Sequence, residues 1–413
     1  MQRKSFLFTP LMILVCFPLY AANQFLCNAL GQGATLRVSL PFGGDGYCIE
    51  GIDFKAESKK MSQGLIRAKA KSVSSDSADR GPFPTTPQAT PPLYANQKNT
   101  PFVLSVLGDN IVDNEGKVIR LKGIARPSLE WNAQGEFLSE QDFANMKKWG
   151  ANAIRISLNQ SSWFKSKPLD VKGSYKQIID AIVYHATQNG MVIILDLHWT
   201  KDGGQPNMAD KDSLKFWKGV ATQYKDFGNV IFELFNEPAN IEQDVWLNGN
   251  RAYAGYQALY DAVRSTKAQN ICIINGMQWG FNLDFINAHD EYKYAIKGYN
   301  IVYGSHPYRR SYDAIYSSLA GIISRYPILF TEFGDDDAKD YPNSFAPAYT
   351  NTLLFLNQYN GSYTAWAWWV SPDNPAFPTL IGDWEKATPI NGGVIVKEDM
   401  EKNPATPLAI ISK

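Results

Sequence analysis

Apolar strand-like segments alternate with helix-like segments through most of this chain, and this order limits the folds it can adopt. The strand-like segments are short and rich in β-branched and aromatic residues, whereas the segments between them have helical periodicity. The expected strands are residues 119–124, 153–158, 192–197, 230–235, 271–275, 299–304, 328–331 and 363–369. Eight such strands with helical crossovers suit a closed (β/α)8 barrel, the TIM-barrel arrangement.

A doubly wound open sheet is the alternative fold for the same alternation. That fold binds nucleotides through a Gly-rich loop after a strand, and no such loop follows any of these segments. A turn at 113–116 is expected to form a hairpin before the first strand, and Ser139 is a typical N-cap for the first helix. Further helices are expected at 175–188, 213–224, 253–266, 314–325 and 349–359.

Two of the expected strands are followed by a glutamate in similar surroundings. After the segment 230–235 come Glu237 and then Pro238, which prevents further pairing of the strand. The segment 328–331 leads directly into Glu332. The C-terminal strand ends of a (β/α)8 barrel meet on one face, so both carboxylates are expected there. Desolvation at such a position raises the pKa of a glutamate and can make it a proton donor near neutral pH.

Other strand ends add polar and aromatic side chains to the same face. They are Arg155, His198, Asn236, His306, Tyr308, Trp366 and Trp368. Zinc is an alternative interpretation, because two histidines and two glutamates are suitable ligands, but the H-E-x-x-H spacing is missing. Carboxylates that cluster with aromatic rings are more typical of sugar chemistry, so we expect no metal and no cofactor. The acidic run 335–337 is interpreted as an exposed loop instead of a calcium site.

These motifs resemble the pattern of glycoside hydrolase family five, the cellulase family, over residues 101–400. The likeness is carried by the Asn-Glu-Pro motif at 236–238 and the Thr-Glu-Phe-Gly motif at 331–334, each at its strand position. It implies that Glu237 is the general acid/base, that Glu332 is the nucleophile and that the sugar keeps its anomeric configuration.

The resemblance also assigns residues that support the two glutamates. It implies that Asn236 binds the sugar 2-hydroxyl and that Arg155 and Tyr308 hold Glu332 ionised and oriented. A neighbouring cation lowers the pKa of a carboxyl group, which agrees with this role. The charge of Glu237 is less compensated by neighbouring cations, so Glu237 is expected to stay protonated until it donates its proton. Retention requires the two carboxyl groups to lie about 5–5.5 Å apart, whereas inversion requires about 6.5–9.5 Å.

The expected partner is a β-linked polysaccharide substrate. By the same resemblance His198 and His306 line the subsite where the bond is cleaved, and Trp368 is the tryptophan expected to stack on the sugar there. The leading hypothesis is a secreted endo-β-1,4-glucanase that acts on cellulose or a related β-glucan. The same machinery acting on β-mannan or xyloglucan is one alternative. A catalytically silent carbohydrate-binding barrel is the other, although the intact pair Glu237 and Glu332 argues against it.

The residues before the barrel differ in composition from the rest of the chain. Residues 1–22 have a basic start and an apolar run too short for a membrane span, which is typical of an export signal. After its removal we expect no membrane segment. The expected division is a signal peptide at 1–22, a small N-terminal module at 23–70, a Pro/Ser-rich linker at 71–100 and the catalytic barrel at 101–405.

Charge and cysteine content complete the sequence-based expectations. The chain has 40 basic and 40 acidic side chains, so a nucleic-acid partner, which needs a basic excess, is not expected. We expect a monomer. In an exported protein Cys27 and Cys48 would pair as a disulfide within the N-terminal module. Cys272 lies in a buried-strand pattern and is interpreted as an inert core thiol.

Overall fold

The computed structural model of the protein describes residues 103–166, 174–287, 293–323, 325–334, 345–374 and 377–408. The predicted signal peptide, N-terminal module, Cys27–Cys48 disulfide and linker lie outside the described residues, as does the acidic run 335–337. None of the helices in the described ranges is both long enough and apolar enough to cross a membrane.

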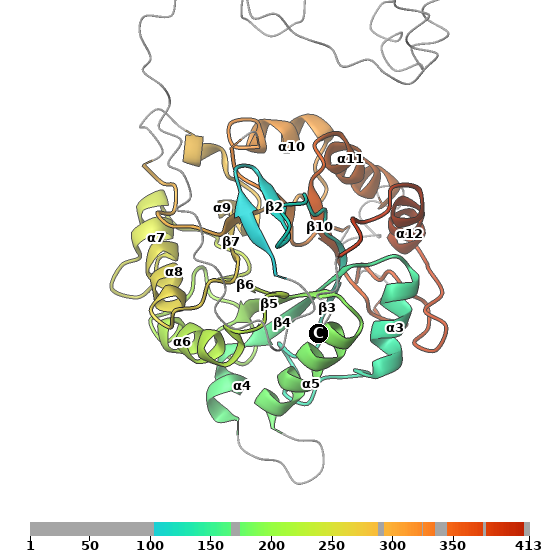
Figure 1. Cartoon of the computed structure of the whole chain (residues 1–413), viewed down its shortest axis with the longest axis horizontal. Helices are drawn as coiled ribbons and strands as arrows, with labels where there is room; N and C mark the ends of the chain where they lie inside the picture. The colour runs from blue at the N-terminus through green and yellow to red at the C-terminus, as the bar shows by residue number, and fades with distance from the viewer. Residues whose placement is uncertain are drawn as a thin grey trace, which may run out of the picture. The chain divides into compact units, whose positions relative to one another are not determined.

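Eight parallel strands close into a barrel, as the sequence predicted, with helices arranged around them (Figure 1). Their order around the barrel is β10-β3-β4-β5-β6-β7-β8-β9, so each strand pairs with its neighbours in the chain and the last pairs with the first. The strands are β3 (Lys122–Arg126), β4 (Ala153–Asn159), β5 (Val192–Trp199), β6 (Val230–Glu233), β7 (Cys272–Asn275), β8 (Ile301–Gly304), β9 (Ile328–Phe330) and β10 (Ser362–Ala365).

The helices form where an apolar face and a capping residue coincide. In α5 the buried side chains of Ile179, Ile182 and Val183 recur at helical spacing, and Ser174 and Gln177 form a capping box at its start. The helices are α3 (Glu140–Lys148), α4 (Gln160–Lys165), α5 (Tyr175–Gln188), α6 (Ser213–Tyr224), α7 (Gln243–Asn248), α8 (Tyr256–Arg264), α9 (Met277–Gly280), α10 (Tyr312–Leu319), α11 (Phe345–Gln358) and α12 (Gly392–Lys402), with a 3-10 turn at Asp284–Asn287.

Most of these elements agree with the sequence-based expectations. Ser139 does cap α3, because its hydroxyl accepts a hydrogen bond from the amide of Asp142. The helices α4, α7, α9 and α12 were not predicted, since the first three are too short to show a period and α12 begins with two glycines. The first barrel strand begins at Lys122 and not at Ile119, because the amide of Ile119 donates to Ile111 of the preceding hairpin.

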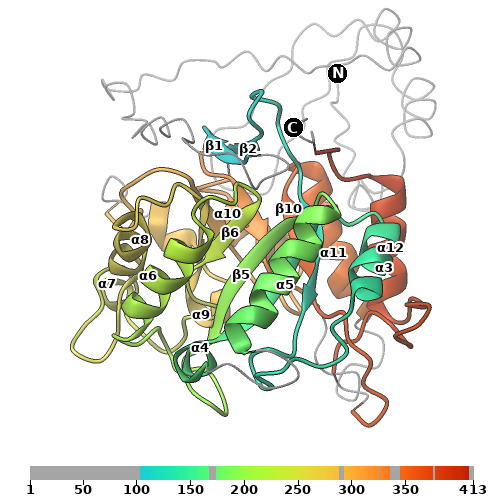
Figure 2. The ribbon, with the colours of Figure 1, turned by 60° about the horizontal axis from the view of Figure 1, so that its bottom comes forward.

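A hairpin of β1 (Ser105–Leu107) and β2 (Asn110–Val112) closes the N-terminal end of the barrel (Figure 2). Its buried side chains form one apolar cluster with side chains of the barrel strands and of the residues just before those strands. The cluster includes Val106, Ile111, Ile194, Ile231 and Ile273. The predicted turn at 113–116 follows this hairpin and returns the chain to pair with it at Val118. The open end of the barrel is therefore the C-terminal end.

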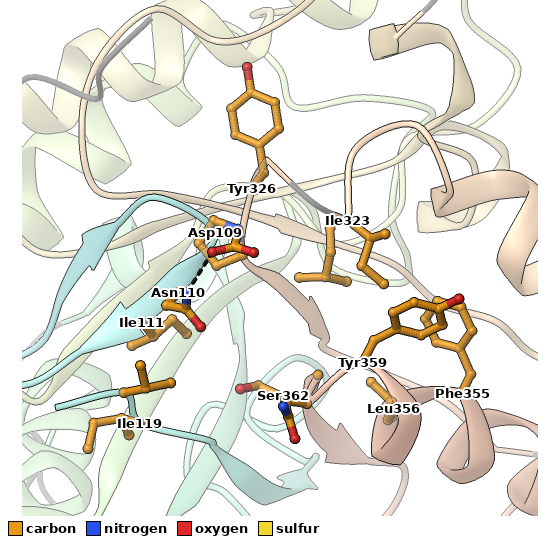
Figure 3. A pocket seen from close by; sticks show the side chains of 15 residues that line it. Asp109, Asn110, Ile111, Ile119, Ile323, Tyr326, Phe355, Leu356, Tyr359 and Ser362 are labelled. Carbon is orange, nitrogen blue, oxygen red and sulfur yellow. Dashed lines mark hydrogen bonds between the residues drawn. The ribbon is translucent and has the colours of Figure 1, made fainter. Parts of the chain in front are cut away.

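A cavity of about 150 Å³ lies beside the β1–β2 hairpin (Figure 3). It is bounded by β2, the start of β9 and the end of α11. Among its lining residues are Asp109, Ile111, Tyr326, Phe355 and Tyr359. Asp109, its one carboxylate, already accepts a hydrogen bond from Asn110, so this cavity lacks the paired acids found at the opposite end of the barrel.

Candidate active site

A cleft of about 590 Å³ opens at the C-terminal end of the strands. Glu237 reaches it after β6, His306 after β8 and Glu332 after β9, which are the strands that the sequence analysis assigned to them. One carboxylate oxygen of Glu237, one of Glu332 and one ring nitrogen of His306 all lie within 4.8 Å of one another. This spacing of the nearest oxygens agrees with the short separation of a retaining pair.

Arg155 holds Glu332 from inside the barrel. Its Nη1 donates to Oε2 of Glu332 over 2.8 Å, and both side chains are nearly inaccessible to solvent. Nε and Nη2 of the same guanidinium bind the two oxygens of Glu233 at 2.7 and 3.0 Å. Nη2 also forms an ion pair with Asp196 at 3.0 Å. The sequence analysis predicted the contact with Glu332, but it missed Glu233 and Asp196.

Glu233 and Asp196 share one cation, and their pKa values move in opposite directions. Burial alone would raise the pKa of Glu233, but the charge of Arg155 and the bonds from His306 and Arg155 outweigh it and lower the value to about 2. Burial raises the pKa of Asp196 well above its usual range, and the negative charge of Glu233 adds to this effect. Both residues interrupt an apolar strand pattern with a carboxylate, and this interruption was the sequence signal that could have identified them.

Tyr308 holds the second oxygen of Glu332. Its phenol donates to Oε1 of Glu332 over 2.5 Å. Burial and the adjacent negative charge of Glu332 raise the pKa of Tyr308 well above its usual value, so the phenol keeps its proton and acts as a donor. With Arg155 on Oε2, both oxygens of Glu332 are held in a fixed direction, as the sequence analysis expected.

His306 is the immediate partner of Glu237. Its Nδ1 lies 2.9 Å from Oε1 of Glu237, and its Nε2 lies 2.8 Å from the hydroxyl of Thr331. Burial lowers the pKa of His306, but the charges of Glu332 and Glu237 and bonds to Glu233 and Glu237 raise it to about 9. A charged imidazole with both nitrogens engaged is a poor ligand for a metal ion, which disfavours the zinc interpretation.

The contact with His306 corrects the expected protonation of Glu237. Burial favours the neutral acid, but the hydrogen bond and charge of His306, with smaller contributions from His198 and Arg155, bring the pKa of Glu237 below its usual value. The expectation that Glu237 is less compensated than Glu332 and stays protonated until it donates was therefore wrong for the free protein. In the substrate-free protein the proton of this pair lies on His306.

Comparison with known proteins agrees with this geometry. The family model of cellulase, glycosyl hydrolase family 5, matches residues 112–372. The chain belongs to this family. An endoglucanase of Clostridium saccharobutylicum is 28% identical over 312 residues, which are 72% of this chain and 64% of that protein. Endoglucanase 5 of Pectobacterium carotovorum subsp. carotovorum is 26% identical over 319 residues, which are 75% of this chain and 59% of that protein. The chain thus spans less than two thirds of the length of these relatives.

Solved structures share the fold of this family 5 chain. A β-glucanase from Saccharophagus degradans superposes with a TM-score of 0.59 at 22% identity, over 75% of this chain and 97% of that one. An endocellulase from Pyrococcus horikoshii, solved with cellotetraose, gives a TM-score of 0.61 at 18% identity, over 74% of this chain and 100% of that one.

Trp366, and not the predicted Trp368, lines the cleft of this family 5 barrel. Trp368 has no exposed surface; its ring packs edge-on against Trp149, and its indole N–H donates to Asp142 of α3 over 2.6 Å. Trp366 lines the cleft with 8% of its surface exposed. The sequence could not separate them, because β10 ends at Ala365 and strand alternation stops before both.

His198 reaches the site through Trp366 and Asp196. The His198 and Trp366 rings stack 5.8 Å apart with an interplanar angle of 4°. Nδ1 of His198 lies 2.7 Å from Oδ2 of Asp196. Burial lowers the pKa of His198, so its imidazole is neutral beside a carboxyl group that is itself inclined to be neutral. His198 thus supports the wall of the cleft behind Trp366.

An exposed tryptophan that lines the same cleft escaped the sequence analysis. Trp279 lines the cleft with 56% of its surface exposed. It lies in the turn after β7, where Gln278 and Trp279 both have left-handed backbone angles. The next residue, Gly280, is required there, because a Cβ atom would come within 2.9 Å of the His306 ring. The Asn-Gly-Met-Gln-Trp-Gly sequence after the strand was the signal available.

The coupling between His306 and Glu237 makes a testable prediction. The ring of His306 is expected to titrate with a pKa of about 9, well above the usual value of about 6.5. Glu237→Gln removes one of the carboxylates that stabilise the imidazolium, so it is expected to lower this pKa. NMR titration measures both values, with His306→Gln used to assign the signal. A ring that titrates near the usual value, or that ignores the substitution, contradicts the assigned coupling.

Proposed function

We propose that this protein is a retaining endo-β-1,4-glucanase that cleaves cellulose or a related β-glucan. The observation that carries the proposal is the carboxylate pair, in which Glu332 is fixed by Arg155 and Tyr308 and faces Glu237 at the spacing of a retaining enzyme. Membership of the cellulase family and the names of the related endoglucanases support it.

In the first step, a carboxylate oxygen of Glu332 forms a bond to the anomeric carbon of the bound sugar. The bond from that carbon to the glycosidic oxygen breaks, and its electron pair stays on the oxygen, which takes a proton from Glu237. In the second step, Glu237 removes a proton from water, and the water oxygen displaces Glu332 from the same carbon. Two displacements restore the original configuration.

The first step requires Glu237 to be protonated, although His306 holds the shared proton in the free enzyme. The side chain of Glu237 retains 19% of its exposure, so a bound sugar removes water from it. Loss of water favours the neutral acid over the carboxylate. The 2.9 Å contact with Nδ1 of His306 then allows the proton to pass to Glu237 as the substrate enters.

The aromatic residues of the rim fit a sugar chain that crosses the barrel mouth. Trp366 and Trp279 both line the cleft, and Trp279 is the more exposed of the two. Trp131, with 40% of its surface exposed, contacts Trp369 edge-on at 5.3 Å. Indole faces suit the apolar faces of glucose rings. β-Mannan and xyloglucan present similar faces, so a reducing-sugar assay over a panel of β-linked polysaccharides decides the substrate. Turnover of none of them would favour the silent barrel.

Substitution of the two glutamates tests the assigned roles. Glu332→Ala is expected to abolish hydrolysis while the fold is preserved, and added azide is expected to restore turnover with an α-glycosyl azide as product. Glu237→Ala is expected to slow cleavage of unactivated glucan by about 100- to 10,000-fold, the usual contribution of a general acid. Circular dichroism controls for folding. A folded Glu332→Ala variant with substantial activity contradicts the proposal.

The two tryptophans after β10 are expected to respond differently. Trp366→Ala removes a face of the cleft and is expected to lower kcat/KM on β-glucan by about tenfold or more. Trp368→Phe leaves the buried carboxylate of Asp142 with one donor fewer and is expected to cost about 1–3 kcal/mol of stability. A Trp368→Phe variant that weakens substrate binding at unchanged stability would restore the original assignment.

We further propose that the enzyme is secreted as a monomer after removal of residues 1–22. The basic start and short apolar run support export, and the Pro/Ser-rich composition of 71–100 supports a linker that separates the module at 23–70 from the barrel. Mass spectrometry of the exported protein is expected to find a new N-terminus near residue 23. A variant lacking residues 1–100 is expected to keep its activity on soluble glucan, and a loss there would contradict a separable barrel.

A further inference from the structure

We propose that Gln205 is a positioning residue for Glu237 and also stabilises the carboxylate of Glu237 once its proton has left. The inference rests on the proposed function, because it assigns Glu237 the role of acid/base. Gln205 is half-buried in the loop after β5, next to the short pairing of Lys201 with Gly204. Nothing in the sequence pattern distinguished it.

The direction of the hydrogen bonds around Gln205 is fixed by Arg155. A guanidinium group can only donate, so the atom of Asn236 that lies 2.7 Å from Nη2 of Arg155 must be its oxygen. The amide nitrogen of Asn236 therefore faces Gln205 and donates to Oε1 over 2.6 Å. Nε2 of Gln205 is left to face Glu237, and it donates to the backbone oxygen of that residue over 3.2 Å.

The same Nε2 of Gln205 lies 3.3 Å from Oε2 of the Glu237 side chain. The other oxygen, Oε1, is occupied by His306. This contact is longer than the usual distance of about 2.7–2.9 Å for a charge-assisted hydrogen bond, although Glu237 is ionised in the free enzyme. Once substrate binding has passed the proton of His306 to Glu237, the same N–H faces a neutral acid. As Glu237 transfers its proton to the glycosidic oxygen, negative charge develops on the carboxylate and the contact strengthens. An interaction that is stronger in the transition state than before it lowers the barrier.

Gln205 differs from the titratable and charged groups that face Glu237. Those groups are Asp196 and His198 of β5, Arg155 of β4, His306 after β8 and Glu332 after β9. His306 changes its charge when the shared proton moves, so its support for the carboxylate varies during the reaction. The amide of Gln205 does not titrate and offers the same N–H at every pH.

Gln205 also sets the direction of Asn236. With Oδ1 held by Arg155 and one N–H held by Gln205, the Asn236 amide cannot rotate. Among the described residues, its other N–H has no hydrogen-bond acceptor. This N–H is therefore available to a sugar hydroxyl. One glutamine thus orients both the acid/base and the adjacent residue expected to bind substrate.

The test compares substrates that do and do not need an acid. Gln205→Glu has nearly the same shape and still accepts from Asn236, but its carboxylate cannot donate to Glu237. Gln205→Ala removes the side chain altogether. Both variants are assayed on cellotetraose, whose sugar leaving group needs a proton, and on 2,4-dinitrophenyl β-cellobioside, whose leaving group does not. Asp202→Asn, in the same loop but paired with Lys165, is the matched control.

A roughly 10- to 100-fold loss of kcat/KM is expected on cellotetraose, the effect of one charge-assisted hydrogen bond, with little loss on the activated substrate. Loss of a donor to the carboxylate raises the pKa of Glu237, so the alkaline limb of the kcat/KM profile is expected to move to higher pH, further in Gln205→Glu than in Gln205→Ala. The control is expected to match wild type.

Three outcomes would overturn the assignment of Gln205. Equal losses on both substrates with an unmoved alkaline limb would indicate a purely structural role. Unchanged activity on cellotetraose would indicate no role. If Gln205→Glu does not fold, as judged by thermal unfolding, Gln205→Ala alone decides between these results. An inactive wild-type protein on both substrates would instead reject the proposed function.

Discussion

The guanidinium of Arg155 is the interaction on which the rest of the site depends. A fully buried cation costs several kcal/mol of desolvation unless its hydrogen bonds are satisfied by opposite charges. Arg155 meets this requirement with Asp196, Glu233 and Glu332, and its remaining contact goes to the oxygen of Asn236. Removing any one of these partners leaves charge uncompensated inside the barrel. The orientation of Glu332 is therefore a consequence of a charge cluster that the fold must complete.

The closed barrel makes this cluster possible by setting the height of each side chain. Ser157, Asp196 and Glu233 are register partners on β4, β5 and β6, so they form one layer of the interior. Below this layer, apart from Arg155 in register with Ile194, the interior is lined by an apolar cluster that includes the β1–β2 hairpin. Above it the strands end and the cleft begins. The interior thus changes from apolar to charged along the barrel axis, and the chemistry is located where the polar layer meets solvent.

The sequence predicted what repeats along the chain and missed what depends on contacts across the barrel. Strand and helix periodicity identified the eight strands. The position of Glu237 and Glu332 just after apolar strand segments placed both at the correct end of the barrel. The partnership of His306 with Glu237 joins loops from two strands that are not adjacent, and no local pattern records it. Trp366 and Trp368 are two residues apart, and only packing against α3 decides which is buried.

The charges of the buried cluster suit the transition state of glycoside cleavage. The cations of this cluster are Arg155 and His306, and the carboxyl groups that face them include Glu233, Glu237 and Glu332. The carboxyl group of Asp196 also faces Arg155, but burial raises its pKa well above the usual range and so favours its neutral form. Passing the proton from His306 to Glu237, as proposed, moves charge within the site without changing its total. Under the proposed function, positive charge develops on the sugar as the glycosidic bond breaks, beside the carboxyl groups of Glu237 and Glu332. His306 takes part in the proposed reaction through the proton that it passes to Glu237, and Arg155 takes part through its hold on Glu332.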